Sequence, residues 1–392
     1  MTFLHLSDLH IGKTVNGFSM LDEQRSFFKQ VIKYIQAEKP AAVIIAGDVY
    51  DRAVPGIESV IMFDDFLTEL SNEDLTVIIV SGNHDSPERL NFASRLLTEK
   101  QIHVCGMFDG KLRSLPLHDE YGDVHFWLLP FIKPASVRDI FSQRVIDTYD
   151  DALLAALESA NIDYAQRNVL VSHQFFTKTG ANVVRSDSEL NLVGGLDAMN
   201  VDLISRFDYA ALGHLHGAQS VAYDHICYAG SPLKYSFSEQ HQKKSVSLVK
   251  LREKGSLTTV KLPITPLHDM RQIKGKLDDL TNAQLFERDS GALKNSIDDY
   301  LHVVLTDCEE ITDPMGKLRS IYPNIMALDF ENSRTNIDLG AIAANSEKIE
   351  TLSVYDLFCN FFLEASGSVM SNEQSSIVRE MLEQTKETNE TS

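Results

Sequence analysis

Short apolar runs recur through the first 240 residues of this 392-residue chain, and they constrain its fold more than any other feature. Runs of this length are typical of buried strands. Between several of them lie segments whose apolar residues repeat every three or four positions, as in amphipathic helices. The alternation predicts an α/β domain. The expected strands are 3–6, 41–46, 76–80, 126–129, 169–171 and 209–212, and the expected helices are 21–37, 57–70, 88–97 and 149–157.

Aspartate, asparagine or histidine follows five of these expected strands. Alone, each such residue is most often a turn residue or a helix cap. Ligands of α/β sheets bind at the carboxyl ends of strands, however, so five such ends can converge on one site. The candidate residues are Asp8, His10, Asp48, Asp51, Asn83, His84, His173, His214 and His216.

The candidate side chains have the chemistry of a metal site. Carboxylate, amide and imidazole ligands without sulfur suit Mn²⁺, Fe or catalytic Zn²⁺. Seven ligands from among these nine residues would be too many for one ion and about right for two. Two ions about 3.5–4 Å apart can clamp a phosphate and activate a water. The sequence therefore predicts a two-metal centre that cleaves phosphoesters.

Composition sets the broad class. The chain is long enough for two or three domains, and its 43% apolar and 23% charged residues are ordinary for a globular protein. No apolar run is long enough to span a membrane, so we expect no membrane partner. No secretory signal precedes the first strand, and the four cysteines are far apart, so we expect a cytoplasmic protein. The net charge of −20 disfavours strong nucleic-acid binding.

The segments around these residues resemble a known superfamily. Asp8-x-His10, Gly47-Asp48-x-x-Asp51, Gly82-Asn83-His84-Asp85, His173 and Gly213-His214-x-His216 are similar to the calcineurin-like metallophosphoesterases. Within them, "HLSDLHIGK", "GDVYDR", "SGNHDSPERL" and "GSPLKYSFSE" resemble the SbcD family of bacterial nuclease subunits. The resemblance implies a metallophosphoesterase β-sandwich flanked by helices, with a small α+β capping domain and a C-terminal helical tail.

The resemblance also implies residue roles. Asp8, His10 and His216 would bind one metal, Asn83, His173 and His214 the other, and Asp48 both. His84 would be the general acid, and Asp51 would hydrogen-bond it. Asp85 is expected to cap a helix that begins near Pro87. Two divalent ions are implied, Mn²⁺ before Mg²⁺, Fe²⁺ or Zn²⁺. Four basic residues beside the motifs would either contact DNA or be solvent-exposed without a ligand: Lys13, Arg52, Arg89 and Lys234.

The same resemblance predicts a nuclease domain at 1–262, a DNA-capping domain at 263–330, a linker at 331–350 and C-terminal helices at 351–392. These C-terminal helices would bind the coiled-coil base of the ATPase SbcC. In the capping domain we expect strands at 301–305 and 325–330 and helices at 270–280 and 314–321. The helices at 57–70 and 88–97 would form a homodimer, which gives a heterotetramer with SbcC.

The implied activity is a 3′–5′ exonuclease on double-stranded DNA and an endonuclease on single-stranded or hairpin DNA, in DNA end processing, replication, repair and recombination. Two alternatives stay open: a phosphodiesterase or phosphatase for small substrates, and a non-catalytic scaffold that binds SbcC and DNA.

Overall fold

The computed structural model describes residues 1–178, 186–189, 198–282, 297–309, 311–331, 354–366 and 369–390. The chain divides into two compact units, Met1–Met270 and Arg271–Ser392. The predicted linker at 331–350 lies outside the described residues except for Glu331. No helix among the described residues has both the length and the apolar character needed to cross a membrane.

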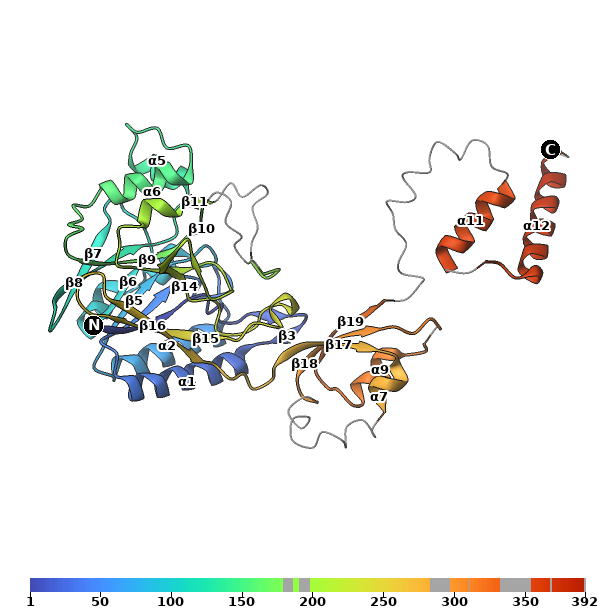
Figure 1. The fold of residues 1–392 in the computed structure, drawn as a ribbon, viewed down its shortest axis with the longest axis horizontal. Helices are drawn as coiled ribbons and strands as arrows, with labels where there is room; N and C mark the ends of the chain where they lie inside the picture. Colours follow the sequence, from blue (N-terminus) through green and yellow to red (C-terminus); the bar gives the residue numbers. More distant parts are fainter. Residues whose placement is uncertain are drawn as a thin grey trace. The chain divides into compact units, whose positions relative to one another are not determined.

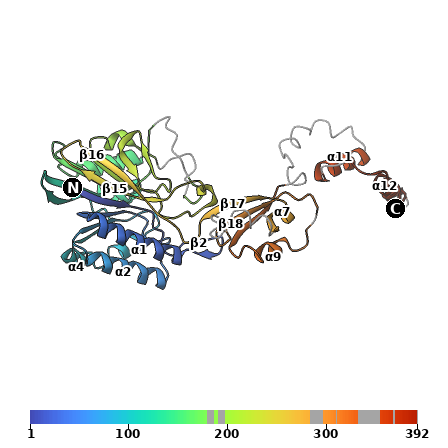
Figure 2. The ribbon, with the colours of Figure 1, turned by 60° about the horizontal axis from the view of Figure 1, so that its bottom comes forward.

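The first unit contains two six-stranded sheets (Figure 1). In the first sheet, four parallel strands continue into two antiparallel ones, in the order β16-β15-β1-β4-β5-β6. Helices α1 (Leu21–Glu38) and α2 (Ile57–Ser71) cover its outer face (Figure 2). The strands are β1 (Thr2–Leu6), β4 (Ala42–Ala46), β5 (Thr76–Val80), β6 (Ile102–Cys105), β15 (Ser245–Leu251) and β16 (Leu257–Pro263).

The second sheet has the order β13-β14-β12-β9-β8-β7. Its outer face packs against α5 (Pro134–Ile140) and α6 (Tyr149–Glu158). The side chain of Thr148 caps the N-terminus of α6. The strands are β7 (Arg113–Asp119), β8 (Gly122–Leu129), β9 (Arg167–His173), β12 (Tyr209–Gly213), β13 (Gln219–Val221) and β14 (Tyr223–Tyr228).

Side chains that alternate between the two faces of a strand contribute to two separate hydrophobic cores. In β4, Val43 and Ile45 pack in the core beneath α1 and α2, whereas Ile44 packs in the core between the two sheets. Successive side chains of a strand point to opposite faces, so one run of apolar residues fills both cores. Phe126 and Tyr209 of the second sheet meet Phe3 edge-on in the core between the sheets. The arrangement confirms the predicted α/β sandwich flanked by helices.

Shorter elements complete the first unit. The predicted helix at 88–97 is wrong as one element, because Ala93 has a left-handed backbone with φ 57° and separates two single-turn helices, α3 and α4. The short elements are β2 (Thr14–Val15), β3 (Phe18–Ser19), α3 (Pro87–Leu90), α4 (Ser94–Leu97), η1 (Thr98–Lys100), β10 (Phe176–Thr177), β11 (Met199–Asn200), η3 (Val201–Ile204) and η4 (Phe237–Glu239).

The described residues of the second unit form a small α+β core of three strands and two helices. The predicted helix at 270–280 is wrong in its first half, which forms a strand, β17 (Met270–Gly275), before the short helix α7 (Leu277–Thr281). The core also contains β18 (Tyr300–Leu305), α9 (Pro314–Arg319) and β19 (Ile325–Phe330). Two further helices, α11 (Val354–Ser366) and α12 (Asn372–Glu390), lie in the C-terminal segment.

Candidate metal centre

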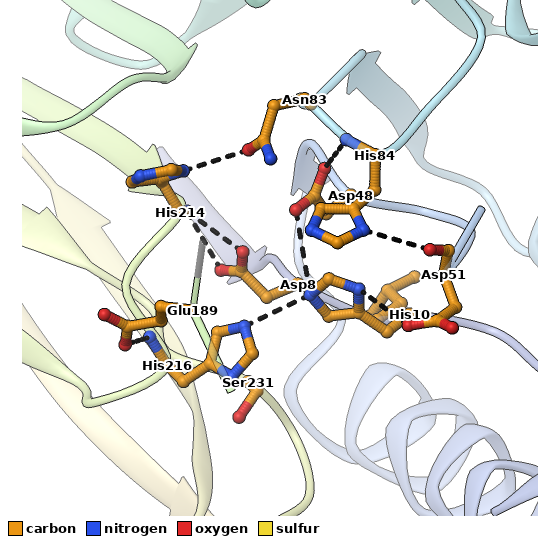
Figure 3. Close-up of polar contacts among 12 residues, drawn as sticks. Asp8, His10, Asp48, Asp51, Asn83, His84, Glu189, His214, His216 and Ser231 are labelled. Carbon is orange, nitrogen blue, oxygen red and sulfur yellow. Dashed lines mark hydrogen bonds and ion pairs between the residues drawn. The ribbon is translucent and has the colours of Figure 1, made fainter. Parts of the chain in front are cut away.

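Strand ends of both sheets bring the predicted ligands and the predicted general acid His84 together (Figure 3). Loops after β1, β4 and β5 of the first sheet supply five residues, and the ends of β9 and β12 in the second sheet supply the rest. The first group is Asp8, His10, Asp48, Asn83 and His84, and the second is His173, His214 and His216.

One cluster joins the two sheets through Asp8, His10 and His216, which are all buried. Their ligand atoms lie within 4.8 Å of one another. The Nε2 atoms of His10 and His216 face each other at 3.1 Å, and Asp8 Oδ1 accepts the backbone N–H of His214 at 3.0 Å. Two imidazole nitrogens and a carboxylate that converge in this way form a donor set suited to a divalent cation.

Asp48 lies between this cluster and the next. Its Oδ2 is 3.7 Å from His10 Nε2 and 3.3 Å from His173 Nε2. Burial alone would raise the pKa of Asp48, but the neighbouring imidazoles, His173 foremost, hold that pKa well below its usual value. Burial would lower the pKa of His173, yet the carboxylates of Asp48 and Asp8 raise it to about 9. Asp48 is therefore an anionic bridge between the two clusters.

Asn83 completes the second cluster. Its Oδ1 lies 3.1 Å from His173 Nε2 and 3.0 Å from His214 Nδ1. The seven predicted metal ligands thus gather at one place, with oxygen and nitrogen donors and no thiolate among them. These residues fit two divalent cations that share one carboxylate.

The loops that carry the ligands have an unusual backbone. Asp8, His10, Asp48 and His214 have φ values of 53°, 45°, 50° and 107°, in a region that few residues other than glycine adopt. The chain also approaches itself closely here, because a Cβ at Gly82 would lie 2.1 Å from Asp48 Oδ1. Glycine at this position leaves room for the bridging carboxylate.

His84 and Asp51 lie beside the first cluster. They are hydrogen-bonded, as predicted, but through the backbone of Asp51. His84 Nδ1 is 3.0 Å from the backbone carbonyl oxygen of Asp51, not from its carboxylate. The Asp51 carboxylate accepts from Lys13 Nζ at 2.9 Å and lies 3.6 Å from His10 Nδ1. The ring of His84 meets that of His10 edge-on at 4.8 Å.

The prediction that Asp85 caps the helix at Pro87 is wrong. Ser86 is the cap of α3, and its hydroxyl accepts the N–H of Arg89. The Asp85 carboxylate instead accepts the N–H groups of Val49, Tyr50 and Gly82 at 3.1, 2.9 and 2.9 Å. It ties the loop after β4 to the loop after β5.

The four basic residues that were predicted to contact DNA differ in their surroundings. Lys13 pairs with Asp51 inside the site, and Lys234 Nζ pairs with Asp269 at 2.6 Å and donates to the carbonyl of Gln240 at 2.8 Å. Arg52 has 77% of its side chain exposed, and Arg89 is exposed on α3.

A supporting layer behind the ligands was not predicted. Gln24 of α1 donates to the carbonyls of Leu9 and His10, and Tyr235 donates to Leu9 at 2.5 Å. The Tyr235 ring packs edge-on against His10 and His216, and burial raises its pKa well above the usual value. Tyr235 lies in the "GSPLKYSFSE" stretch at 230–239, whose resemblance to the family predicts a functional segment but no role for Tyr235 itself.

Comparisons with known proteins show the family of the chain. Residues 1–218 match the family model of the calcineurin-like phosphoesterases, and residues 266–365 match that of the type 5 capsule protein repressor C-terminal domain. The chain is 34% identical over 332 residues to the SbcD subunit of the nuclease SbcCD from Staphylococcus epidermidis, a match that covers 84% of this chain and 85% of the relative.

Solved structures are also similar to the chain. A phosphopantetheinyl hydrolase from Mycobacterium tuberculosis is 17% identical, with a TM-score of 0.37 over 66% of this chain and 95% of the hydrolase. A dimetal phosphatase from Danio rerio is 12% identical, with a TM-score of 0.37 over 67% of this chain and 98% of the phosphatase.

Proposed function

This chain belongs to the calcineurin-like phosphoesterases and, within them, to the SbcD family, and we propose on that basis that it hydrolyses DNA phosphodiester bonds as the nuclease subunit of an SbcCD-type complex. The observation that carries the proposal is the convergence of seven oxygen and nitrogen ligands, with Asp48 between two clusters and His84 beside them. Such a set suits hydrolysis of a phosphoester by two metals.

In the proposed centre, each cluster holds one cation. Asp8, His10 and His216 would bind one, Asn83, His173 and His214 the other, and Asp48 both, with Mn²⁺ expected before Mg²⁺, Fe²⁺ or Zn²⁺. Bound cations would supply an activated water and offset the charge that develops on the phosphate.

His84 is proposed to protonate the leaving sugar oxygen. A carbonyl oxygen only accepts hydrogen bonds, so the contact with Asp51 requires a proton on His84 Nδ1. The proton delivered to the leaving group would then come from Nε2 of the charged ring. The backbone of Asp51, rather than its carboxylate, would set the ring's orientation, while the carboxylate holds Lys13.

The expected DNA substrates and cleavage polarity are those of the SbcD family. We propose 3′–5′ exonuclease activity on double-stranded DNA and endonuclease activity on single-stranded and hairpin DNA, within replication, repair and recombination. The exposed Arg52, next to Asp51, is the best placed of the four basic residues to meet a phosphate, ahead of Lys13, Arg89 and Lys234. The three-stranded α+β domain would cap the DNA.

The His84→Ala variant tests this function. With Mn²⁺, wild-type protein should cleave linear and hairpin DNA, and His84→Ala should be slower by about 10²–10⁴-fold because it lacks the proton donor. His118→Ala is the matched control, since His118 is an exposed histidine on β7 and should not matter.

The same assay separates the alternatives. Cleavage of bis-p-nitrophenyl phosphate without DNA cleavage, even with SbcC present, would replace the proposal with a small-substrate phosphodiesterase. Mn²⁺ binding without any cleavage would favour a scaffold.

We also propose that α11 docks on the coiled-coil base of SbcC. Val354, Phe358 and Phe361 are exposed at helical spacing and form an apolar stripe, whereas Tyr355 lies beneath Arg379 of α12. Such a stripe suits binding in an apolar groove of a partner.

The docking proposal predicts that Phe361→Asp abolishes co-elution with SbcC on gel filtration, because it places a charge in the stripe. The variant should keep the nuclease activity of the isolated chain. Glu373→Ala, an exposed change on α12, should co-elute like wild type. Co-elution of Phe361→Asp would contradict the docking site.

A further inference from the structure

A buried polar network lies behind His216, on the side of the ring away from the other ligands. While Nε2 faces His10, Nδ1 lies 2.6 Å from Ser188 Oγ and 3.5 Å from Glu239 Oε1. Ser188 Oγ is also 2.6 Å from Glu239 Oε1. Glu239 is fully buried at the end of η4, and the proposed function gives it no role.

The carboxylate of Glu239 is held in its ionised form by a buried lysine. Lys244 Nζ lies 2.5 Å from Glu239 Oε2, and the side chains are 7% and 0% exposed. Lys244 also donates to Ser231 Oγ at 2.8 Å and to the backbone carbonyl of His216 at 2.9 Å. Loss of either charge would leave the other buried and uncompensated, which is strongly destabilising.

The chemistry of the network fixes the direction of its hydrogen bonds. The hydroxyl oxygens of Ser188 and Ser186 lie 2.6 and 2.7 Å from Glu239 Oε1 and 2.8 Å from each other. An ionised carboxylate only accepts, so both hydroxyl protons go to Glu239 and neither is left for the other serine. Ser188 Oγ must then accept from His216, which places the ring proton on Nδ1. Nε2 is left with its lone pair toward Asp8 and His10, as a metal ligand requires.

We propose that Glu239, acting through Ser188, is a positioning residue that sets the tautomer and the ring orientation of His216 for metal binding. The inference rests on the proposed two-metal function and assigns a role to the segment at 230–239. Partners of this kind behind a ligating histidine typically change metal affinity by about 10–100-fold.

Three variants and a control test the inference. Ser188→Ala removes the acceptor of the His216 proton, Ser188→Thr restores a hydroxyl, and Glu239→Gln removes the charge that sets the direction. Asp208→Asn is the matched control, because Asp208 is also buried and its Oδ2 pairs with Lys254 at 2.7 Å, but it precedes β12 at the end opposite to His214.

The measurement is Mn²⁺ binding to the full chain, followed by the electron paramagnetic resonance signal of free Mn²⁺. Wild type should bind two ions. Ser188→Ala and Glu239→Gln should bind one of the two about 10–100-fold more weakly and keep the other, whereas Ser188→Thr and Asp208→Asn should match wild type. If Glu239→Gln does not fold by circular dichroism, the two variants at the partly exposed Ser188 decide the question.

Two results would overturn the inference, and they can be told apart. If wild type binds two Mn²⁺ ions and Ser188→Ala binds them equally well, the positioning role is wrong and the proposed function stands. If wild type binds neither Mn²⁺ nor, in competition with a metal indicator, Mg²⁺, Fe²⁺ or Zn²⁺, the proposed function fails, and the inference fails with it.

Discussion

Asp85 connects two loops of the metal centre without belonging to its ligands. Its carboxylate accepts three backbone N–H groups, and burial together with the charge of Asp48 raises its pKa to about 6. Asp85→Ala would leave these buried donors without an acceptor, so we expect the free energy of unfolding to fall by about 3 kcal/mol.

Urea denaturation measures this change. Asp85→Asn is the comparison, because its amide oxygen can still accept the N–H groups of Val49 and Gly82, whereas its NH₂ group faces the N–H of Tyr50. The loss of stability should therefore be smaller than in Asp85→Ala. Equal losses in both variants would mean that the charge matters more than the hydrogen bonds.

At the scale of single residues, the sequence predicted which side chains meet but not what each of them contacts. The positions of Asp48 and His214 after buried strands were enough to bring them together, because strand ends of a sheet share one edge. The contacts of Asp51 and Lys234 depend on loop backbone and side-chain rotamers, which spacing does not encode. Their partners, Lys13 and Asp269, could be found only in three dimensions.

At the scale of elements, the hairpin of β7 and β8 is tied to β9 by an ion pair. Arg167 donates from Nη1 to Asp119 Oδ2 at 3.1 Å, and the α-amino group of Met1 lies beside the same carboxylate. Burial would raise the pKa of Asp119, but hydrogen bonds from Arg167 and that amine hold it well below its usual value. Asp119→Asn should therefore destabilise the fold, by about 1–3 kcal/mol at neutral pH.

The destabilisation should depend on pH with a definite sign. A carboxyl whose pKa is depressed by folding contributes stability above its unfolded pKa of about 3.9 and loses it as the pH falls through the folded value. The difference in unfolding free energy between wild type and Asp119→Asn should be constant from pH 7 to 5 and shrink below about pH 4. A difference that grows on acidification would contradict this origin.

The elements that the sequence misassigned are those in which local pattern and tertiary pairing disagree. Met270, Ile273, Leu277 and Leu280 have helical spacing, yet the first two lie in β17, which pairs in a sheet with β18. Tertiary pairing overrides a weak local preference. The buried strand β4 and the long helix α1 carried strong patterns and were predicted to within one residue at each end.

At the scale of the whole molecule, exposed apolar side chains form a surface through which we propose that two copies of the chain associate. Ile57, Ile61, Phe92 and Leu96 are 80%, 54%, 81% and 69% exposed, on α2, α4 and the loop before α4. Exposed apolar residues of this size are typical of interaction surfaces. They support the proposed homodimer, in which the two copies of α2 would meet.

Light scattering after gel filtration tests the dimer. We expect wild type to be a dimer and the double variant Ile61→Glu/Phe92→Glu to be a monomer, because charges would be buried at the interface. Val145→Glu, at another highly exposed apolar position, should remain a dimer. A dimeric double variant would place the interface elsewhere.

The left-handed backbone at four of the metal-site residues has a consequence for how the centre acquires its ions. Bonds from Asp8 N to the carbonyl of Gly47 at 3.1 Å and from His10 N to that of Asp48 at 3.0 Å hold these loops in the conformation that presents the ligands. The surrounding protein sustains the strain of this backbone. In the proposed two-metal function the ligand set would therefore need little reorganisation to bind its ions, and such common oxygen and nitrogen donors would select weakly among divalent cations.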